Sequence, residues 1–185
     1  WTRLSNQIYA TGPPCSPSTV MEYVRYLQES CLLISIDNYA SKFVEKETIK
    51  KHNFLDNGLL HLFINNPNTS LLENLCAITL YKKYAKGLYY YNKNIEVDFY
   101  VPDEGLAVQA SYQMSDGETI EREVKALVAL HGLHPLKRAM IITYEDEGEI
   151  VRDGLRIEIR PAWKWVLEGL YLLLFPVRFL IRNIH

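Results

Sequence analysis

The chain has 185 residues, of which 48% are hydrophobic and 23% are charged, and its formal net charge at pH 7 is −2. This is the composition of an ordinary globular protein, long enough for one medium domain or two small ones. The near-neutral charge excludes binding to nucleic acid or to an anionic membrane through overall charge. Such a contact would need a local basic patch.

The cysteines indicate the cellular compartment, and the first residue suggests that the chain is a fragment. Cys15, Cys31 and Cys76 are far apart and form no CxxC pair, so they predict neither a zinc ligand set nor a disulfide framework. This favours a reducing, cytoplasmic location. The chain begins at Trp1, without an initiator Met or a signal segment, and we therefore expect a fragment whose natural N-terminal part is missing.

The N-terminal third has the element order of a winged helix. We expect the remains of one helix over 4–10 and a second helix over 16–30, where Ser16 can cap the end and Pro17 suits the first turn. A β-rich run follows over 31–39, then a lysine-rich loop, a strand over 52–56 and a short helix after Asn57-Gly58. This order predicts a winged helix-turn-helix domain over residues 1–65, truncated at its N-terminus.

The polar segment 64–70, INNPNTS, is the best candidate for a domain boundary. The expected elements after it are a helix over 71–85, strands over 87–94, 95–101 and 106–113, a helix over 117–133, and strands over 139–146 and 155–161. This order predicts an α/β (α+β) domain over 66–167 with a mixed sheet flanked by helices.

The C-terminal tail is very apolar. Glu168, Pro176 and Arg178 interrupt it, so its longest uncharged run is well short of the ~20 residues that a membrane span needs. For residues 168–185 we predict a buried helix or one that docks on a partner protein. A helix lying in a membrane interface is the alternative.

Eight stretches, taken together, resemble a known family. They are SPSTVMEYVRYLQESCLL, KKHNFLDNGLL, LLENL, LYYYNKNIEVDFYV, AVQASYQMSD, ETIEREVKAL, IITYEDE and IEIRPAWKWVL, and they cover nearly all of residues 4–167 in order. This ordered set resembles the C-terminal half of a large family of bacterial and archaeal AAA-type ATPases, best represented in gut Bacteroidetes. In that family an ATPase domain precedes a winged helix and an uncharacterised nuclease-like domain. The resemblance implies a restriction-endonuclease-like core of the PD-(D/E)xK type for residues 66–167.

The sequence has no Walker A motif, GxxxxGK[ST]. ATP binding is therefore expected only in the missing N-terminal ATPase domain, which would be a partner of this fragment. No cofactor is expected in the fragment itself, unless Mg²⁺ binds an active nuclease-like site.

The resemblance also implies a site. In the family pattern a helix Glu, a strand Asp and the acidic residue of E-x-K bind Mg²⁺, and the Lys activates the attacking water. The matching positions are Glu73 of LLENL, Asp98 of EVDF, and Gln109 and Ser111 of VQASY. Glu73 and Asp98 are thus the implied Mg²⁺ ligands, since this ion prefers carboxylate oxygens.

Strand alternation supports this placement. It puts Glu96, Asp98 and Tyr100 on one face of their strand, Val97, Phe99 and Val101 on the other, and Gln109 and Ser111 on a common face of the next strand.

The matched site lacks two of its charges. Gln109 offers a neutral carbonyl where the pattern has a carboxylate, and Ser111 has no positive charge. Their loss should cost several orders of magnitude in rate. We therefore predict a catalytically silent centre in a regulatory or interaction module. The alternative is a Mg²⁺-dependent nuclease with a displaced Lys, such as Lys125. A Lys ammonium within reach of Glu73 and Asp98 would favour that enzyme.

DNA binding through the winged helix is a third hypothesis. Arg25 on the expected recognition helix and Lys50 and Lys51 near the wing are the candidates for phosphate contacts. Glu22 and Glu29 on the same helix argue against major-groove binding, and a solvated loop explains the lysines equally well. Without DNA, the winged helix would dock a protein or couple to the ATPase.

Overall fold

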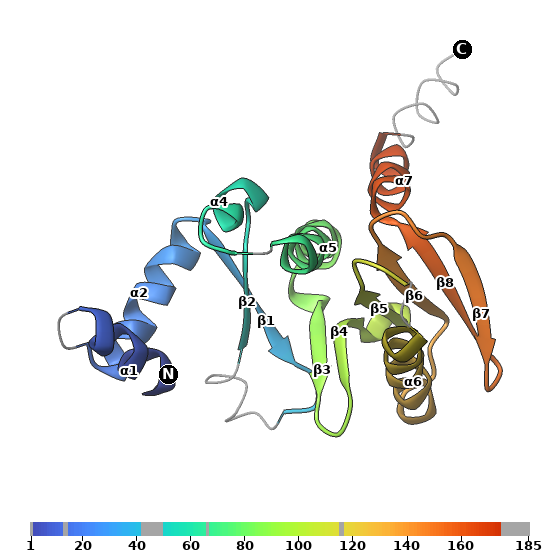
Figure 1. Cartoon of the computed structure of the whole chain (residues 1–185), viewed down its shortest axis with the longest axis horizontal. Helices are drawn as coiled ribbons and strands as arrows, with labels where there is room; N and C mark the ends of the chain where they lie inside the picture. Colours follow the sequence, from blue (N-terminus) through green and yellow to red (C-terminus); the bar gives the residue numbers. More distant parts are fainter. Residues whose placement is uncertain (1, 13–14, 42–49, 66, 115–116, 175–185) are drawn as a thin grey trace, which may run out of the picture.

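The computed structural model describes residues 2–12, 15–41, 50–65, 67–114 and 117–174. Within this part of the chain, six α-helices and one eight-stranded mixed sheet form an α/β architecture (Figure 1). The mixed α/β class predicted from the sequence is confirmed. The expected wing loop, 42–49, and the end of the tail, 175–185, lie outside the described residues.

The elements follow the predicted order closely. The helices are α1 (Thr2–Thr11), α2 (Pro17–Glu29), α4 (Asn57–His61), α5 (Asn68–Tyr84), α6 (Gly117–Leu133) and α7 (Ala162–Leu174). The strands are β1 (Leu33–Asn38), β2 (Lys50–Phe54), β3 (Tyr89–Asn92), β4 (Glu96–Val101), β5 (Leu106–Ala110), β6 (Arg138–Thr143), β7 (Gly148–Arg152) and β8 (Leu155–Pro161). As predicted, Ser16 caps α2, accepting a hydrogen bond from the Thr19 amide, with Pro17 in the first turn.

Strand β7 was not expected from the sequence. It is a short edge strand with mostly exposed side chains, so it lacks the alternation that marks a half-buried strand. It pairs antiparallel with β8 across a turn at Asp153 and Gly154, whose φ angles are 51° and 80°. Asp-Gly is a favoured pair for such a turn, and this signal was present in the sequence.

The sheet continues across the predicted domain boundary. Its strand order is β2-β1-β3-β4-β5-β6-β8-β7. β1 pairs antiparallel with β2 and parallel with β3, through Asp37 opposite Tyr89 and Asn38 opposite Tyr90. The β1–β2 hairpin of the expected winged helix is thus part of the same sheet as the expected nuclease-like core. The boundary itself stays a prediction.

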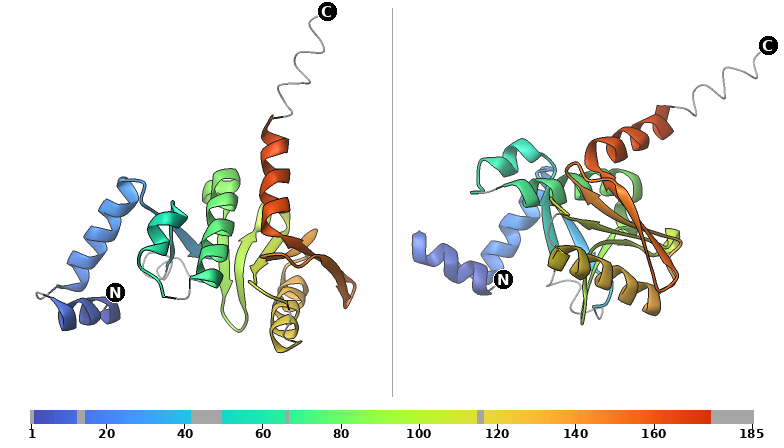
Figure 2. Two further views of the ribbon diagram at one scale, coloured as in Figure 1. Left: turned by 45° about the horizontal axis from the view of Figure 1, so that its top comes forward. Right: turned by 45° about the vertical axis from the view of Figure 1, so that its right-hand side comes forward.

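Helices cover both faces of the sheet (Figure 2). The core on one side joins α5 residues such as Cys76 and Leu80 to Phe99 and Val101 of β4. The core on the other side joins α6 residues such as Leu127 to Val97 and Tyr100 of β4. α7 contributes the buried Ala162 and the partly buried Trp165 to the α5 side.

The prediction that the side chains of β4 alternate strictly between the two faces is wrong, because Val97 and Tyr100 belong to one core and Phe99 and Val101 to the other. The pairing of β3 with β4 moves from Tyr89–Tyr100 to Tyr91–Val97. That is an advance of two residues on β3 (91 − 89) but three on β4 (100 − 97). The extra residue makes a bulge that contains Asp98. Bulges are common beside functional sites because they re-aim a side chain.

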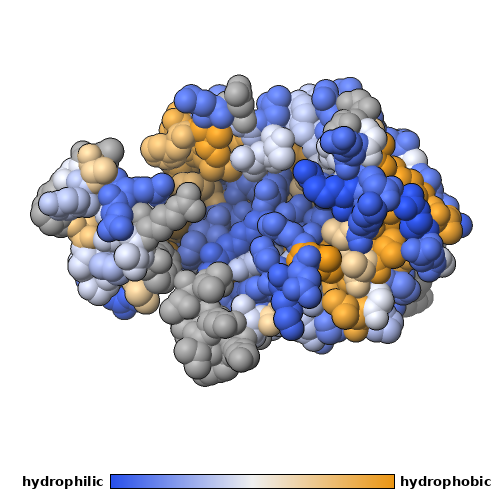
Figure 3. All heavy atoms as spheres, turned by 60° about the horizontal axis from the view of Figure 1, so that its bottom comes forward, coloured by the Kyte–Doolittle hydropathy of each residue, from blue (hydrophilic) through white to orange (hydrophobic). Residues whose placement is uncertain are grey.

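The surface carries two kinds of region. One face is hollowed and mainly hydrophilic across its middle, with apolar patches toward its margins (Figure 3). The exposed apolar side chains include Phe63 after α4, and Trp163 and Leu167 on α7. None of the helices in the described part of the chain has the length and apolar character that spanning a membrane requires.

Candidate functional site

A pocket opens where β4 and β5 separate. The two strands pair only through Phe99–Val101 and Leu106–Val108. Beyond these pairs, the start of β4 and the end of β5 diverge between α5 and α6. The pocket there has a volume of about 740 Å³ and is lined mainly by Glu73, Glu96, Asp98, Gln109, Arg122 and Glu123, with Lys125 at its wall.

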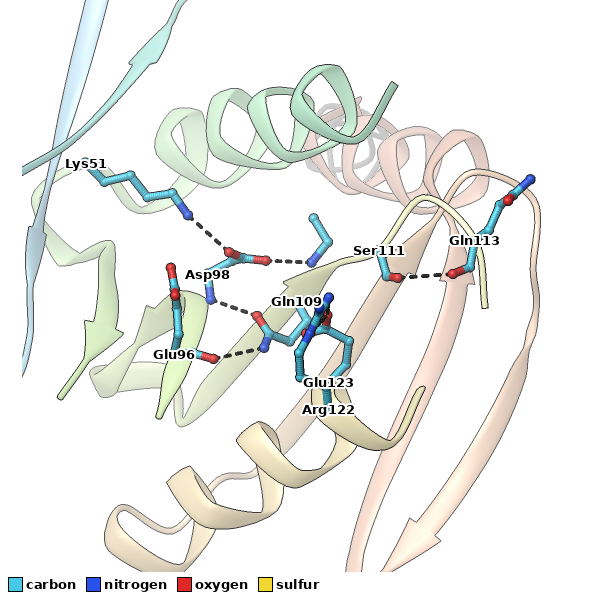
Figure 4. Close-up of polar contacts among 9 residues, drawn as sticks. Lys51, Glu96, Asp98, Gln109, Ser111, Gln113, Arg122 and Glu123 are labelled. Atoms are coloured by element: carbon cyan, nitrogen blue, oxygen red, sulfur yellow. Dashed lines mark hydrogen bonds and ion pairs between the residues drawn. The ribbon is translucent and has the colours of Figure 1, made fainter. Parts of the chain in front are cut away.

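Lys51 brings a positive charge into this region (Figure 4). Its Nζ atom lies 3.1 Å from Oδ1 of Asp98 and also forms an ion pair with Glu73 of α5. The three side chains are only 21%, 28% and 17% exposed for Lys51, Glu73 and Asp98 respectively. The structure therefore brings Glu73 and Asp98 together, as the motif implied, and adds a lysine that was expected in the wing. We call Lys51, Glu73, Asp98 and Gln109 the polar centre.

The period of a β-strand explains why Lys51, and not its neighbour, reaches the polar centre. Successive side chains point to opposite faces. Lys50 forms an ion pair of 3.1 Å with Asp37 on the facing strand. His52, two residues further on, shares that face and hydrogen-bonds Ser35, with 2.7 Å between Nδ1 and Oγ. Lys51 points the other way, toward α5 and β4.

The charges of the polar centre shift two of its pKa values. Burial alone would lower the pKa of Lys51, but the negative charges of Asp98 and Glu73 outweigh it and the pKa is raised. Burial, reinforced by the charge of Asp98, raises the pKa of Glu73, and Lys51 offsets only part of this effect. The pKa values of Lys51 and Glu73 are both raised because one ammonium is shared by two carboxylates, which stabilise its charge while they still repel each other.

Gln109 is bonded on both sides to the backbone of β4. Its Oε1 accepts a hydrogen bond of 2.8 Å from the Asp98 amide, and its Nε2 donates one of 3.1 Å to the Glu96 carbonyl oxygen. In the reverse direction, Oδ2 of Asp98 accepts a hydrogen bond of 3.0 Å from the Ala110 amide. These side-chain bonds replace the backbone pairs that the diverging strands no longer make.

The other predicted site residues lie apart from this arrangement. Ser111 is buried, and its hydroxyl donates to the Gln113 carbonyl at 3.3 Å. Lys125, the displaced lysine considered from the sequence, is 70% exposed and pairs with Glu121 at 3.5 Å. Arg25 is exposed and pairs with Glu29 at 3.3 Å. Contacts of Arg25, Lys50 and Lys51 with DNA stay a prediction.

The polar centre, as it stands, does not fit a Mg²⁺ ion. Mg²⁺ takes oxygen ligands in a near-octahedral shell. Here the ammonium of Lys51 already contacts Glu73 and Asp98, and the side-chain oxygen of Gln109 already accepts a hydrogen bond. Across the described ranges, no group of three or more His, Cys, Asp or Glu residues is placed to hold a metal ion.

Comparison of the chain with protein-family models, with curated proteins and with solved structures finds no match. The resemblance to AAA-type ATPases therefore stays a hypothesis that depends on the quoted motifs.

Proposed function

We propose that the chain is a regulatory or interaction module whose nuclease-like centre is catalytically silent. One observation carries the proposal: the polar centre is satisfied internally. The ammonium of Lys51 pairs with both carboxylates, and the amide of Gln109 is bonded to β4 through both its oxygen and its nitrogen.

The physical reason is that the groups expected to act on a metal ion and a phosphate are already bonded to one another or to β4. Metal-dependent phosphodiester cleavage draws its transition-state stabilisation from a bound cation and from a positive group beside the phosphate. In this centre the positive group is engaged by the carboxylates. The position equivalent to the third ligand carries an amide that completes the strand pairing. Without a bound metal ion and a free positive group beside the phosphate, the rate of cleavage should be lower by several orders of magnitude.

The wider setting of the module comes from the sequence motifs. We propose that it follows an AAA-type ATPase domain in the full-length protein and acts on that domain or on a further protein. In this setting residues 1–65 would be a winged helix that docks or couples to the ATPase, and the apolar tail, residues 168–185, would contact a protein partner. We propose a cytoplasmic location, since the three cysteines form no disulfide framework.

A cleavage assay tests the silent centre. Plasmid DNA and labelled oligonucleotides are incubated with the chain in Mg²⁺ or Mn²⁺, beside the variants Asp98→Ala and Asp103→Ala. Asp103 is an exposed residue of the turn after β4 and serves as the matched control. We expect no cleavage above background from any of them, and a lower unfolding midpoint for Asp98→Ala alone. Cleavage by the unmodified chain that disappears in Asp98→Ala would overturn the proposal.

One observation favours a second candidate, a Mg²⁺-dependent nuclease with a displaced lysine. The ammonium of Lys51 lies within reach of both Glu73 and Asp98, as that enzyme would require. The candidate predicts that the same assay detects cleavage, and that Lys51→Met and Asp98→Ala each abolish it while Lys125→Met does not. Absence of cleavage from the unmodified chain rejects it.

A further inference from the structure

We propose that Lys51 is a tethered counter-cation, which holds the space between Glu73 and Asp98 and excludes divalent cations from it. This inference rests on the proposed silent centre and explains how that centre stays closed. The residue that closes it comes from β2, in the N-terminal hairpin, and is 47 positions away from Asp98 in the sequence.

The contacts of the ammonium support this role. Nζ of Lys51 bridges two carboxylates that come from different elements, Glu73 from α5 and Asp98 from β4. An ammonium that serves two carboxylates does what a bound cation does at such a site, because it compensates charges that would otherwise repel each other.

An aromatic ring adds a third contact to the ammonium. Nζ lies 5.3 Å from the centroid of the Phe99 ring, whose side chain is fully buried. A cation near an aromatic face is stabilised electrostatically, more so when it is partly removed from water. The ammonium therefore has an aromatic ring beside it as well as two charged partners.

The charge balance gives a testable consequence. With Lys51 protonated, the two carboxylates and one ammonium sum to −1. Replacing Lys51 with Met keeps an unbranched side chain of similar length but removes the ammonium, and so leaves two neighbouring negative charges without compensation. A divalent cation would then be the natural replacement, since Mg²⁺ and Mn²⁺ bind carboxylate oxygens.

The experiment compares thermal unfolding of the full chain and of Lys51→Met, followed by circular dichroism. Each protein is measured in MgCl₂ and in KCl at the same ionic strength. We expect the unmodified chain to have the same midpoint in both salts. We expect the midpoint of Lys51→Met to be lower in KCl and to rise by about 3 °C or more in MgCl₂, as binding to the folded state requires.

Two controls assign the effect to the polar centre. Lys50→Met removes the neighbouring lysine on the opposite face of β2 and should give no Mg²⁺-specific rise. Lys51→Met combined with Asp98→Asn removes one of the two carboxylates and should abolish most of the rise. The inference is overturned if the unmodified chain gains as much from Mg²⁺ as Lys51→Met does, or if Lys51→Met gains nothing.

A further variant keeps the test decisive if Lys51→Met does not fold in either salt. Adding Glu73→Gln to Lys51→Met removes one of the uncompensated charges and should restore folding; failure to do so would also overturn the inference. The two proposals fail differently. DNA cleavage by the unmodified chain rejects the silent centre, whereas an equal Mg²⁺ response of both proteins without cleavage rejects only the counter-cation.

Discussion

The junction between β4 and β5 and the junction between β1 and β3 are both completed by a carboxamide side chain. At the first, Gln109 accepts from the Asp98 amide at 2.8 Å and donates to the Glu96 carbonyl at 3.1 Å. At the second, Asn38 accepts from the Asn92 amide at 3.0 Å and donates to the Asn92 carbonyl at 2.6 Å. Each side-chain amide thus replaces a pair of backbone hydrogen bonds where the strands separate.

The two junctions differ in their charged surroundings. Gln109 bonds to the strand that carries Asp98, in a pocket also lined by Glu73 and Glu123. Within the described part of the chain, the side chain of Asn38 hydrogen-bonds to backbone groups only, those of Ala40 and Asn92. Because the same amide geometry occurs where no carboxylate takes part, strand pairing alone is a sufficient reason for an amide at position 109. Gln109 thus has a structural role in joining β4 and β5, which does not depend on metal binding.

Gln109→Glu should have the largest effect. A carboxylate cannot donate to the Glu96 carbonyl, so two oxygens would face each other inside the protein, close to the negative charge of Asp98. Gln109 is 3% exposed, and leaving a buried acceptor unpaired beside a like charge costs about 3 kcal/mol of unfolding free energy. Chemical denaturation at neutral pH measures the loss.

The matched control for that variant is Gln113→Glu, which changes the charge equally at an exposed side chain of the following segment. It should alter the unfolding free energy by less than about 0.5 kcal/mol. Equal stability of the two variants would show that the amide at 109 is not needed for pairing. The comparison between the two junctions would then fail.

Asn38→Asp should have the second largest effect. The change again replaces an amide donor with an oxygen that faces a backbone carbonyl, but among the residues that the structure describes no other carboxylate takes part in the hydrogen bonds of this junction. We therefore expect a smaller loss, about 2 kcal/mol, from the unpaired Asn92 carbonyl. Denaturation beside Asn92→Asp gives the control, because Asn92 has an exposed side chain and joins the junction through its backbone. A loss larger than that of Gln109→Glu would contradict the role assigned to the neighbouring charges.

The sequence predicted the elements well because their apolar periodicity is local. The helix that carries Glu73 and the strand that carries Asp98 were found in this way, and the structure brings the two side chains together. The bulge at Asp98 was not predictable, since it depends on how β3 pairs with β4. Strict alternation was wrong there for that reason.

The position of Lys51 was missed because the contact is remote in sequence. The order of the elements places both adjacent lysines in the expected wing, although strand alternation sends their side chains to opposite faces. That signal could have separated Lys50 from Lys51. Which partners each one meets depends on β2 joining the sheet beside β1 and on the placement of α5, and neither can be derived from local patterns.

The smallest expected effect is a dependence of stability on pH. It should occur at the β4–β5 junction, which has the titrating Glu73 nearby, and not at the amides of the β1–β3 junction. Burial and the neighbouring Asp98 raise the pKa of Glu73 in the folded protein. The folded state therefore holds the Glu73 proton more tightly than the unfolded state does. Glu73 contributes stability below its ordinary pKa of 4.5, and this contribution is lost as pH rises through the raised value.

Glu73→Gln should remove this dependence. The stability of the unmodified chain relative to Glu73→Gln should be greater near pH 4 than at pH 7, as measured by urea denaturation across that range. Asn38→Ala should lower stability by the same amount at both pH values, because neither Asn38 nor Asn92 titrates. If the stability of the unmodified chain relative to Glu73→Gln were instead greater at pH 7 than near pH 4, Lys51 would dominate the environment of Glu73. Its ion pair would then outweigh the burial and the repulsion from Asp98.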